Sequence, residues 1–288
     1  MKIHHLNCTS LCPLGGEHLG GEGDLWTRTT LVCHCLLVEG PDGLILVDTG
    51  FGLEDIRTPN RRMGAPFVWM MQPRLDQAET AIRQVTRLGF KPEDVRHIVL
   101  THLDLDHAGG LADFPWAKVH VYGAEHAAAM APATFVERER YRSVMWEHGP
   151  DWALASAPEG GERWFGLECV RDLPGLPPEV LMVPMPGHTR GHAAVAVQGE
   201  GKWALHAGDA YFYRGEVDPA GPHCPGVLGF YEQLMEVDHE KRLHNQARLR
   251  ELARDHGDQV TLFCAHDPVE LARLAPHQQR PAPGYAAA

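Results

Sequence analysis

Four side chains that can bind a metal ion stand close together in the stretch THLDLDHAGG, which begins at position 101: His102, Asp104, Asp106 and His107. Neutral imidazole and carboxylate are ligands for zinc and similar divalent ions, and three or four protein ligands leave a position open for water or substrate. The alternative is a polar surface loop whose Asp and His residues cap helices or contact water. The density of ligand types favours a metal site.

Other candidate ligands lie far away in the sequence but in a similar local setting. The first group follows the apolar run at 97–100 and precedes a glycine pair, so it is predicted to be a loop at the end of a buried strand. His188, Asp209 and His266 also follow predicted strands. Side chains at strand ends can converge at one edge of a sheet, so we expect these residues to form one site.

The elements that must position these residues follow from hydrophobic periodicity and turn residues. Two apolar runs, 31–38 and 44–47, flank the turn sequence EGPDG and predict a β-hairpin. Cys33 and Cys35 alternate within the first run, which favours small buried residues on one face over a metal or redox role. The remaining predicted strands cover residues 97–100, 117–122, 180–183, 193–197, 203–207 and 260–264, and the predicted helices cover about 76–88, 123–130 and 231–256.

The order of these elements occurs twice. A hairpin, an Asp, a helix, a strand and a His follow one another up to His102 and again up to His266, with Asp48 and Asp209 in matching places. The residues of the two halves differ, so the repeat is one of secondary-structure order and not of sequence. It predicts an α/β fold with two sheets related by a rough two-fold axis and helices outside them.

Composition sets limits on the class of protein. With 288 residues, 44% of them hydrophobic, the chain can bury a large core, and we expect a single domain over residues 1–288. Irregular cover segments are expected near 51–75 and 131–178, where they either shape a substrate site or simply pack. The net charge of −12 argues against nucleic acid and anionic membranes as partners.

The location is also an expectation from the sequence. The start lacks the pattern of a secretion signal, and the seven cysteines form no close disulfide framework, which indicates a reducing cytoplasm. No apolar run is long enough to span a bilayer. We expect a small-molecule substrate, with a homodimer left open.

The combined pattern resembles the metallo-β-lactamase superfamily, whose usual sequence is HxHxDH, then Gly-His, an Asp and a late His. The resemblance runs from the hairpin before Asp48 to His266. It implies a four-layer αββα sandwich with a dinuclear site, in which Asp48 supports the loop. His192 is expected to stand behind the ligands or to be a plain structural residue. The ligands implied for the first metal are His102 and His188, those for the second are Asp106, His107 and His266, and Asp209 bridges the two.

One position departs from that pattern. Asp104 stands where most members of the family have a second His, so a neutral ligand is replaced by a shorter, anionic one. A carboxylate at this place is similar to the flavodiiron branch, which carries Glu there and holds iron. Asp104 either binds the first metal or falls short of it and acts beside it, as a proton carrier. Zinc is the expected metal, with iron and manganese as alternatives.

The resemblance implies hydrolysis. Two divalent ions can share a hydroxide that attacks a substrate carbonyl, and an acid then protonates the leaving oxygen. Asp104 or Asp106 could carry that proton, and Tyr211 or Tyr213, just after Asp209, could donate to the oxyanion. For either tyrosine, ordinary packing is the alternative.

Within the family, the chain looks most like the lactonase branch, which opens acyl-homoserine lactones or related rings. That branch has a Tyr three positions after the bridging Asp, where this chain has Phe212. We therefore expect a lactone or ester hydrolase. The alternatives are a thioester hydrolase like glyoxalase II, an iron-containing redox enzyme suggested by Asp104, and a binding protein with a decayed site. A β-lactamase is disfavoured because no export signal is visible.

Overall fold

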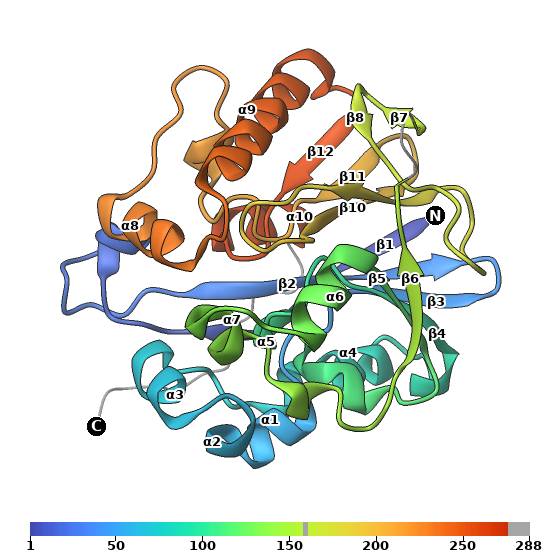
Figure 1. The fold of residues 1–288 in the computed structure, drawn as a ribbon, viewed down its shortest axis with the longest axis horizontal. Helices are drawn as coiled ribbons and strands as arrows, with labels where there is room; N and C mark the ends of the chain where they lie inside the picture. Colours follow the sequence, from blue (N-terminus) through green and yellow to red (C-terminus); the bar gives the residue numbers. More distant parts are fainter. Residues whose placement is uncertain (158–160, 276–288) are drawn as a thin grey trace.

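Two β-sheets pack face to face with helices on their outer sides, which gives the four layers expected from the sequence (Figure 1). The computed structural model describes residues 1–157 and 161–275. In Figure 1, α9 (His239–His256) covers one sheet from above, and α4 (Ala81–Arg87) covers the other from below. The αββα sandwich predicted from the resemblance is therefore confirmed.

The first sheet has six strands in sequence order: β1 (Lys2–Leu11), β2 (Leu31–Gly40), β3 (Gly43–Val47), β4 (Val95–Val99), β5 (Lys118–Tyr122) and β6 (Asp151–Ala155). The predicted hairpin is β2 and β3, where Gly40 pairs with Gly43. From β3 to β6 neighbouring strands run parallel. Parallel strands end at the same edge of a sheet, so the residues that follow β3 and β4 meet there.

The second sheet has four strands in the order β12 (Val260–Phe263), β11 (Trp203–His206), β10 (Ala193–Gln198) and β9 (Val180–Pro184). Strands β11 and β12 run parallel, and the other pairs are antiparallel. The loops after β9, β11 and β12 carry His188, Asp209 and His266. A small separate hairpin is formed by β7 (Arg163–Trp164) and β8 (Leu167–Glu168).

Burial on both faces explains why β2 is almost wholly apolar from Leu31 to Val38, with His34 as the exception. Leu36 and Val38 pack between the two sheets with Val195 and Phe263, whereas Leu37 belongs to the cluster on the outer face of the first sheet. Both faces of the strand are thus buried, and each fully buried aliphatic side chain stabilises the fold by about 1.5 to 3 kcal/mol. Cys33 and Cys35 are buried in the outer cluster, as the alternation predicted.

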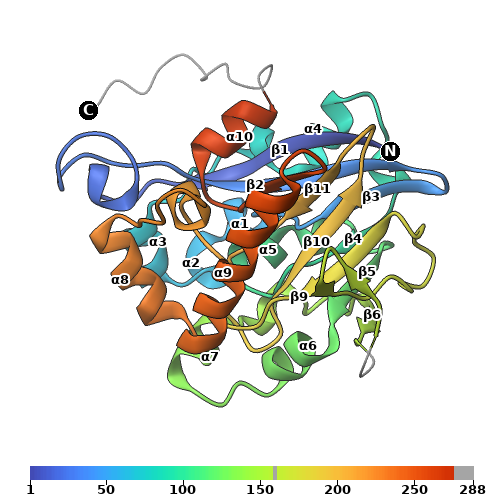
Figure 2. The ribbon, with the colours of Figure 1, turned by 90° about the horizontal axis from the view of Figure 1, so that it is seen from above.

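The remaining α-helices are mostly short. They are α1 (Leu53–Arg57), α2 (Pro59–Arg62), α3 (Ala65–Met71), α5 (Leu105–Ala108), α6 (Gly123–Met130), α7 (Phe135–Arg140), α8 (Gly226–Met235) and α10 (Pro268–Leu274). Single turns of 3₁₀ helix lie at Gly16–Leu19, Gln77–Glu79, Pro92–Asp94, Gly109–Asp113, Ser143–Met145 and Arg214–Val217. Figures 1 and 2 both place α3, α7 and α8 on one side of the molecule.

The two segments expected to be irregular contain regular structure. Residues 51–75 fold into α1, α2 and α3, because Pro59 and Pro66 stand in first helical turns, where proline is well tolerated. Residues 131–178 supply α7 and also β6, which pairs with β5 at the edge of the first sheet. The prolines that suggested loops therefore start helices in the first segment.

Two expected helices are interrupted. The one predicted over 76–88 is a 3₁₀ turn followed by α4, with Thr80 extended between them. The one predicted over 231–256 is two helices, α8 and α9, because the side chain of Asp238 accepts a hydrogen bond from the Lys241 N–H and starts a new helix. No helix in the described ranges is long and apolar enough to cross a membrane.

Candidate metal centre

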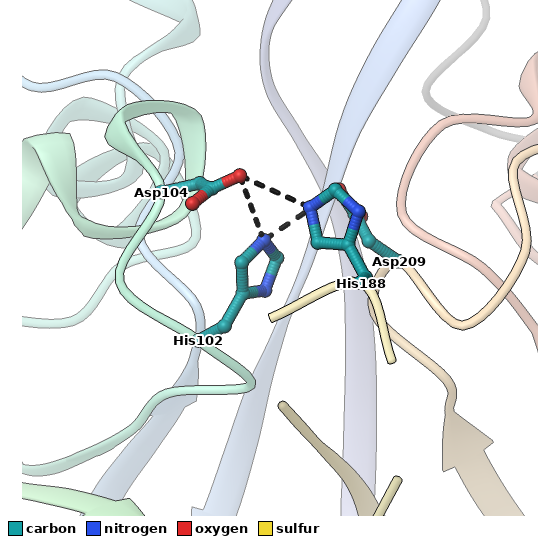
Figure 3. Close-up of side chains that lie close together, drawn as sticks. All are labelled: His102, Asp104, His188 and Asp209. Carbon is teal, nitrogen blue, oxygen red and sulfur yellow. Dashed lines mark hydrogen bonds and ion pairs between the residues drawn. The ribbon is translucent and has the colours of Figure 1, made fainter. Parts of the chain in front are cut away.

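Four donor atoms from three loops and a helix N-terminus face one another in the first donor group. It consists of His102, Asp104, His188 and Asp209, all buried (Figure 3). Asp104 Oδ2 lies 3.5 Å from His102 Nε2 and 3.0 Å from His188 Nε2. Asp209 Oδ2 lies 3.5 Å and 3.4 Å from the same two nitrogens. Asp104 therefore reaches this group with one of its oxygens.

A second donor group, Asp106, His107 and His266, lies beside the first. Asp209 Oδ1 is 3.3 Å from His107 Nε2 and 3.2 Å from His266 Nε2. Asp106 completes the group, with Oδ2 3.7 Å from His266 Nε2. Asp209 Oδ2, which faces the first group, also lies 3.4 Å from His266 Nε2, so Asp209 stands between the two groups. All seven residues predicted as ligands are brought together.

The donor set fits divalent cations. A tetrahedral zinc ion with ligands at ~2.0–2.1 Å holds its donor atoms roughly 3.3–3.4 Å apart, close to the 3.0–3.5 Å separations in the first group. The buried atoms His102 Nε2, His107 Nε2 and Asp209 Oδ1 have no hydrogen-bond partner. Buried polar atoms nearly always have a hydrogen-bond partner or a bound ion, so these unpaired atoms indicate a cation site.

Asp48 holds the motif loop from the end of β3. Its carboxylate accepts hydrogen bonds from the Thr101 N–H at 2.8 Å and the Thr101 hydroxyl at 2.7 Å, and it contacts His107 Nδ1 at 2.8 Å. The last contact leaves His107 Nε2 directed at the donor group, as expected for an outer partner of a ligating histidine. Asp48 adopts a left-handed φ of 54°, which these bonds stabilise.

His192 orients Asp209 from behind and is not in either donor group. Its Nδ1 lies 3.1 Å from the Met185 carbonyl, and its Nε2 accepts the Asp209 N–H at 2.9 Å. Gly208 makes this approach possible: its φ is 54°, and a Cβ there would lie 2.5 Å from His192 Nε2. The expected structural role of His192 agrees with this arrangement.

A buried carboxylate on α6 ties the loops of the two sheets together. Glu125 accepts hydrogen bonds from the Leu103 N–H at 3.0 Å, the Thr189 hydroxyl at 2.6 Å and the Gly191 N–H at 3.1 Å. The Tyr141 hydroxyl donates to it as well, at 3.1 Å. Sequence reasoning missed Glu125, because a single Glu in a predicted helix gives no sign of its partners.

Arg140 is a second residue that the sequence did not reveal. It ends α7, is buried, and places its Nε 3.4 Å from Asp104 Oδ1. Its Nη1 donates to the His188 carbonyl at 2.8 Å. A guanidinium therefore stands directly behind Asp104, the one predicted ligand that departs from the family pattern.

The charges of the donor groups act on each other strongly. Burial and the neighbouring His107 lower the pKa of His102, but the carboxylates of Asp104 and Asp209 outweigh them and raise it to about 9. Burial and the Arg140 guanidinium lower the pKa of His188 to about 4. His188 is therefore neutral at physiological pH, whereas His102 must lose a proton to bind a metal.

The two tyrosines predicted to donate to an oxyanion lie elsewhere. The Tyr211 hydroxyl is buried and donates to Glu270 Oε1 at 3.1 Å. The Tyr213 ring packs against His223 and the guanidinium of Arg214. Tyr211 is thus turned away from the donor groups because Glu270 binds its hydroxyl, whereas Phe212 between the two packs on His188 and His266.

A different tyrosine approaches the centre from α8. The Tyr231 ring lies 6.0 Å from that of Phe212, the residue that contacts the ligands. Burial and then the carboxylates of Asp106 and Asp104 raise the pKa of Tyr231, so its hydroxyl keeps its proton at physiological pH and can donate it in a hydrogen bond. The sequence could not single it out, because it lies on another element, well after Asp209.

We predict that Glu125→Gln weakens both the fold and metal binding. The amide cannot accept from all four donors, and each buried donor left without a partner costs about 1–3 kcal/mol. The free energy of unfolding in urea should fall by about 2–4 kcal/mol, with fewer bound metal equivalents in the purified protein. The control is Glu93→Gln, at an exposed carboxylate. An unchanged stability and metal content would rule out the tie between the loops.

We also predict that metal affinity rises with pH. A folded-state pKa of about 9 means that His102 carries a proton at neutral pH, and a metal must displace it. Against the effect of burial, the carboxylates around His107 and His266 raise the pKa of these histidines as well. The apparent zinc association constant should therefore increase by at least about tenfold per pH unit between about pH 6 and about pH 8.5. Competition with a chromophoric chelator at constant ionic strength measures this slope. A constant that does not change, or that falls, over this range contradicts the prediction.

Comparisons with known proteins agree with this geometry. Residues 28–254 match the family described as the metallo-beta-lactamase superfamily. A probable metallo-hydrolase of Mycobacterium tuberculosis is 45% identical over 96% of this chain and 83% of its own length. An N-acyl homoserine lactonase of Bacillus cereus is 28% identical over 58% of each chain.

Solved structures agree on the fold. A crystal structure of an AiiA variant from Bacillus thuringiensis, with N-decanoyl-L-homoserine bound at its active site, superposes with a TM-score of 0.68. The match covers 93% of this chain and 94% of that one at 21% identity, so it concerns the fold alone. The family match and the curated relatives identify a metallo-hydrolase, and the chain belongs to the metallo-β-lactamase superfamily.

Proposed function

We propose that this metallo-hydrolase holds two divalent metal ions, zinc in the first place, and opens a lactone or another ester. The observation that carries the proposal is the position of Asp209. Oδ2 lies within 3.5 Å of the histidines of the first donor group and also 3.4 Å from His266 Nε2, whereas Oδ1 lies within 3.3 Å of the histidines of the second group. A carboxylate with an oxygen in each group is what a bridging ligand requires.

Each remaining ligand then has one assignment. His102, Asp104 and His188 would hold the first ion, and Asp106, His107 and His266 the second. When bound, two such ions would polarise a substrate carbonyl and lower the pKa of a water molecule. Asp104 suits a ligand better than a proton carrier, because Arg140 occupies its other oxygen.

Asp106 is the better candidate for moving the proton to the leaving oxygen. Its side chain is 13% exposed, against 4% for Asp209, so it can exchange protons with water. Unlike Asp104, it has no arginine on its other oxygen among the described residues. A carboxylate at the edge of a metal site can take a proton from water and pass it to the leaving group. Tyr231 would donate to the oxyanion in place of the residue at position 212.

The class of substrate is proposed from the relatives. N-acyl homoserine lactonases share the family and the fold with this chain, so lactones are the first substrates to test. The aliphatic, neutral character of a lactone also agrees with Phe212, which places an apolar ring against His188 and His266. A thioester hydrolase remains the second candidate, because the same donor groups would act on a thioester carbonyl.

The test is a substrate panel on protein loaded with zinc, manganese or iron(II). It contains lactones with and without an acylamide chain, aryl esters and glutathione thioesters, with Asp209→Asn as the inactive control. We expect turnover of a lactone or ester that disappears in Asp209→Asn together with bound metal. A failure to turn over any lactone or ester, with two metal equivalents present, would falsify the proposal. Turnover of thioesters alone would assign the second candidate.

We predict that Tyr231→Phe lowers kcat on the best substrate and leaves metal content unchanged. Removing one donor to a developing oxyanion costs on the order of 10²-fold in rate. Tyr213→Phe is the matched comparison, because this ring packs on His223 and Arg214. Steady-state kinetics and metal analysis of both variants check this. Equal rates for Tyr231→Phe and the unmodified protein would remove Tyr231 from the mechanism.

A further inference from the structure

We propose that Arg140 and Asp104 act as one unit, in which the buried guanidinium balances and positions a carboxylate ligand that replaces the neutral histidine usual at that place. The inference rests on the proposed metal-binding function of the first donor group. Arg140 is a positioning residue here, since it acts on the metal through Asp104 and lies behind it.

The two oxygens of Asp104 have separate partners. Oδ2 faces the donor group, 3.0 Å from His188 Nε2 and 3.5 Å from His102 Nε2. Oδ1 faces the opposite way, 3.4 Å from Arg140 Nε. Neither Asp104 Oδ1 nor Arg140 Nε has a hydrogen-bond partner, so the ion pair is the main polar contact of both atoms. The carboxylate is thereby held with one oxygen inward.

The guanidinium is fixed from two further sides. Its Nη1 donates to the carbonyl of His188 at 2.8 Å, which belongs to the loop of a ligand. Its Nη2 donates to the carbonyl of Met235 at the end of α8. The side chain is 1% exposed, so neither solvent nor salt can compensate its charge. The Arg140 side chain, which belongs to α7, is therefore held beside the centre by its bonds to α8 and to the His188 loop.

Charge counting gives the reason for the pair. With His102 and His188 neutral, the carboxylates of Asp104 and Asp209 contribute two negative charges, and Arg140 returns one positive charge. The net charge of −1 is the one that a group of three histidines and Asp209 would have. A buried charge without its partner costs several kcal/mol, so neither residue of the pair suits the site alone.

The experiment is a double-mutant cycle on metal binding in the full chain. The proteins are the unmodified chain, Asp104→His, Arg140→Gln and the double variant, each titrated with zinc against a chromophoric chelator. Asp104→His alone leaves the guanidinium uncompensated beside a cation, so we expect weaker binding to the first group. The double variant should bind about tenfold more tightly than the two single effects combined predict, which is a coupling of about 1.4 kcal/mol.

The control variants separate charge from shape and from folding. Arg138→Gln removes an exposed positive charge from the same helix and should leave zinc binding unchanged. Arg140→Lys keeps the charge but cannot donate to both carbonyls, so Asp104→His with Arg140→Lys should bind as weakly as Asp104→His alone. Circular dichroism and thermal unfolding show whether each variant folds. If Arg140→Gln does not fold, the comparison of Asp104→His with and without Arg140→Lys still tests the role of the charge.

The outcomes distinguish the two proposals. Single effects that add within about twofold, in proteins that fold and hold two metal equivalents when unmodified, overturn the coupling of Arg140 to Asp104 and leave the proposed function intact. The coupling is also overturned if Asp104→His with Arg140→Lys binds zinc as tightly as Asp104→His with Arg140→Gln. The positive charge at position 140 would then have no effect on binding. An unmodified protein that binds no divalent metal contradicts the proposed function itself.

Discussion

The donor groups depend on one buried carboxylate that joins loops from two different sheets. Glu125 accepts bonds from the Leu103 N–H of the first sheet's loop and from Thr189 and Gly191 of the second sheet's loop. Gly191 permits this contact, since a Cβ there would lie 2.0 Å from the Glu125 backbone nitrogen. Repulsion between the carboxylates of Asp104 and Asp209 acts to separate the loops, and the neutral donors bound to Glu125 oppose that separation without adding charge to the donor groups.

The histidines of the donor groups are likewise held in place by hydrogen-bond partners outside the centre. His107 Nδ1 contacts Asp48, and His266 Nδ1 lies 2.8 Å from the Val32 carbonyl. His102 Nδ1 is 3.0 Å from the Thr101 hydroxyl. In each case the second nitrogen, Nε2, is left facing the donors. Outer partners of this kind set the tautomer and the ring orientation before any metal arrives, which lowers the entropic cost of binding it.

The sequence predicted the residues that follow strands directly, including those on α5 right after β4, but missed buried residues on helices farther from the strand ends. His188, Asp209 and His266 could be found because an apolar run gives the strand and the residue after it gives the edge of the sheet. Glu125 and Arg140 stand on α6 and α7, where a charged residue usually contacts water, so their burial had no signal. Tyr231 was hidden within a single expected helix, and the break at Asp238 that aims α8 at the centre is a local capping effect.

The segments that surround the centre therefore do more than exclude solvent. Arg140 on α7 contacts the carboxylate of Asp104, and the ring of Tyr231 on α8 lies against Phe212, which packs on His188 and His266. The bond from Arg140 to the Met235 carbonyl joins α7 to α8, so the two groups cannot move independently. A change of the ligand at position 104 thus alters the electrostatics of both helices at once. The departure from the family pattern at Asp104 is accompanied by Arg140, which lies on a helix outside the motif. The motif alone therefore does not define this centre.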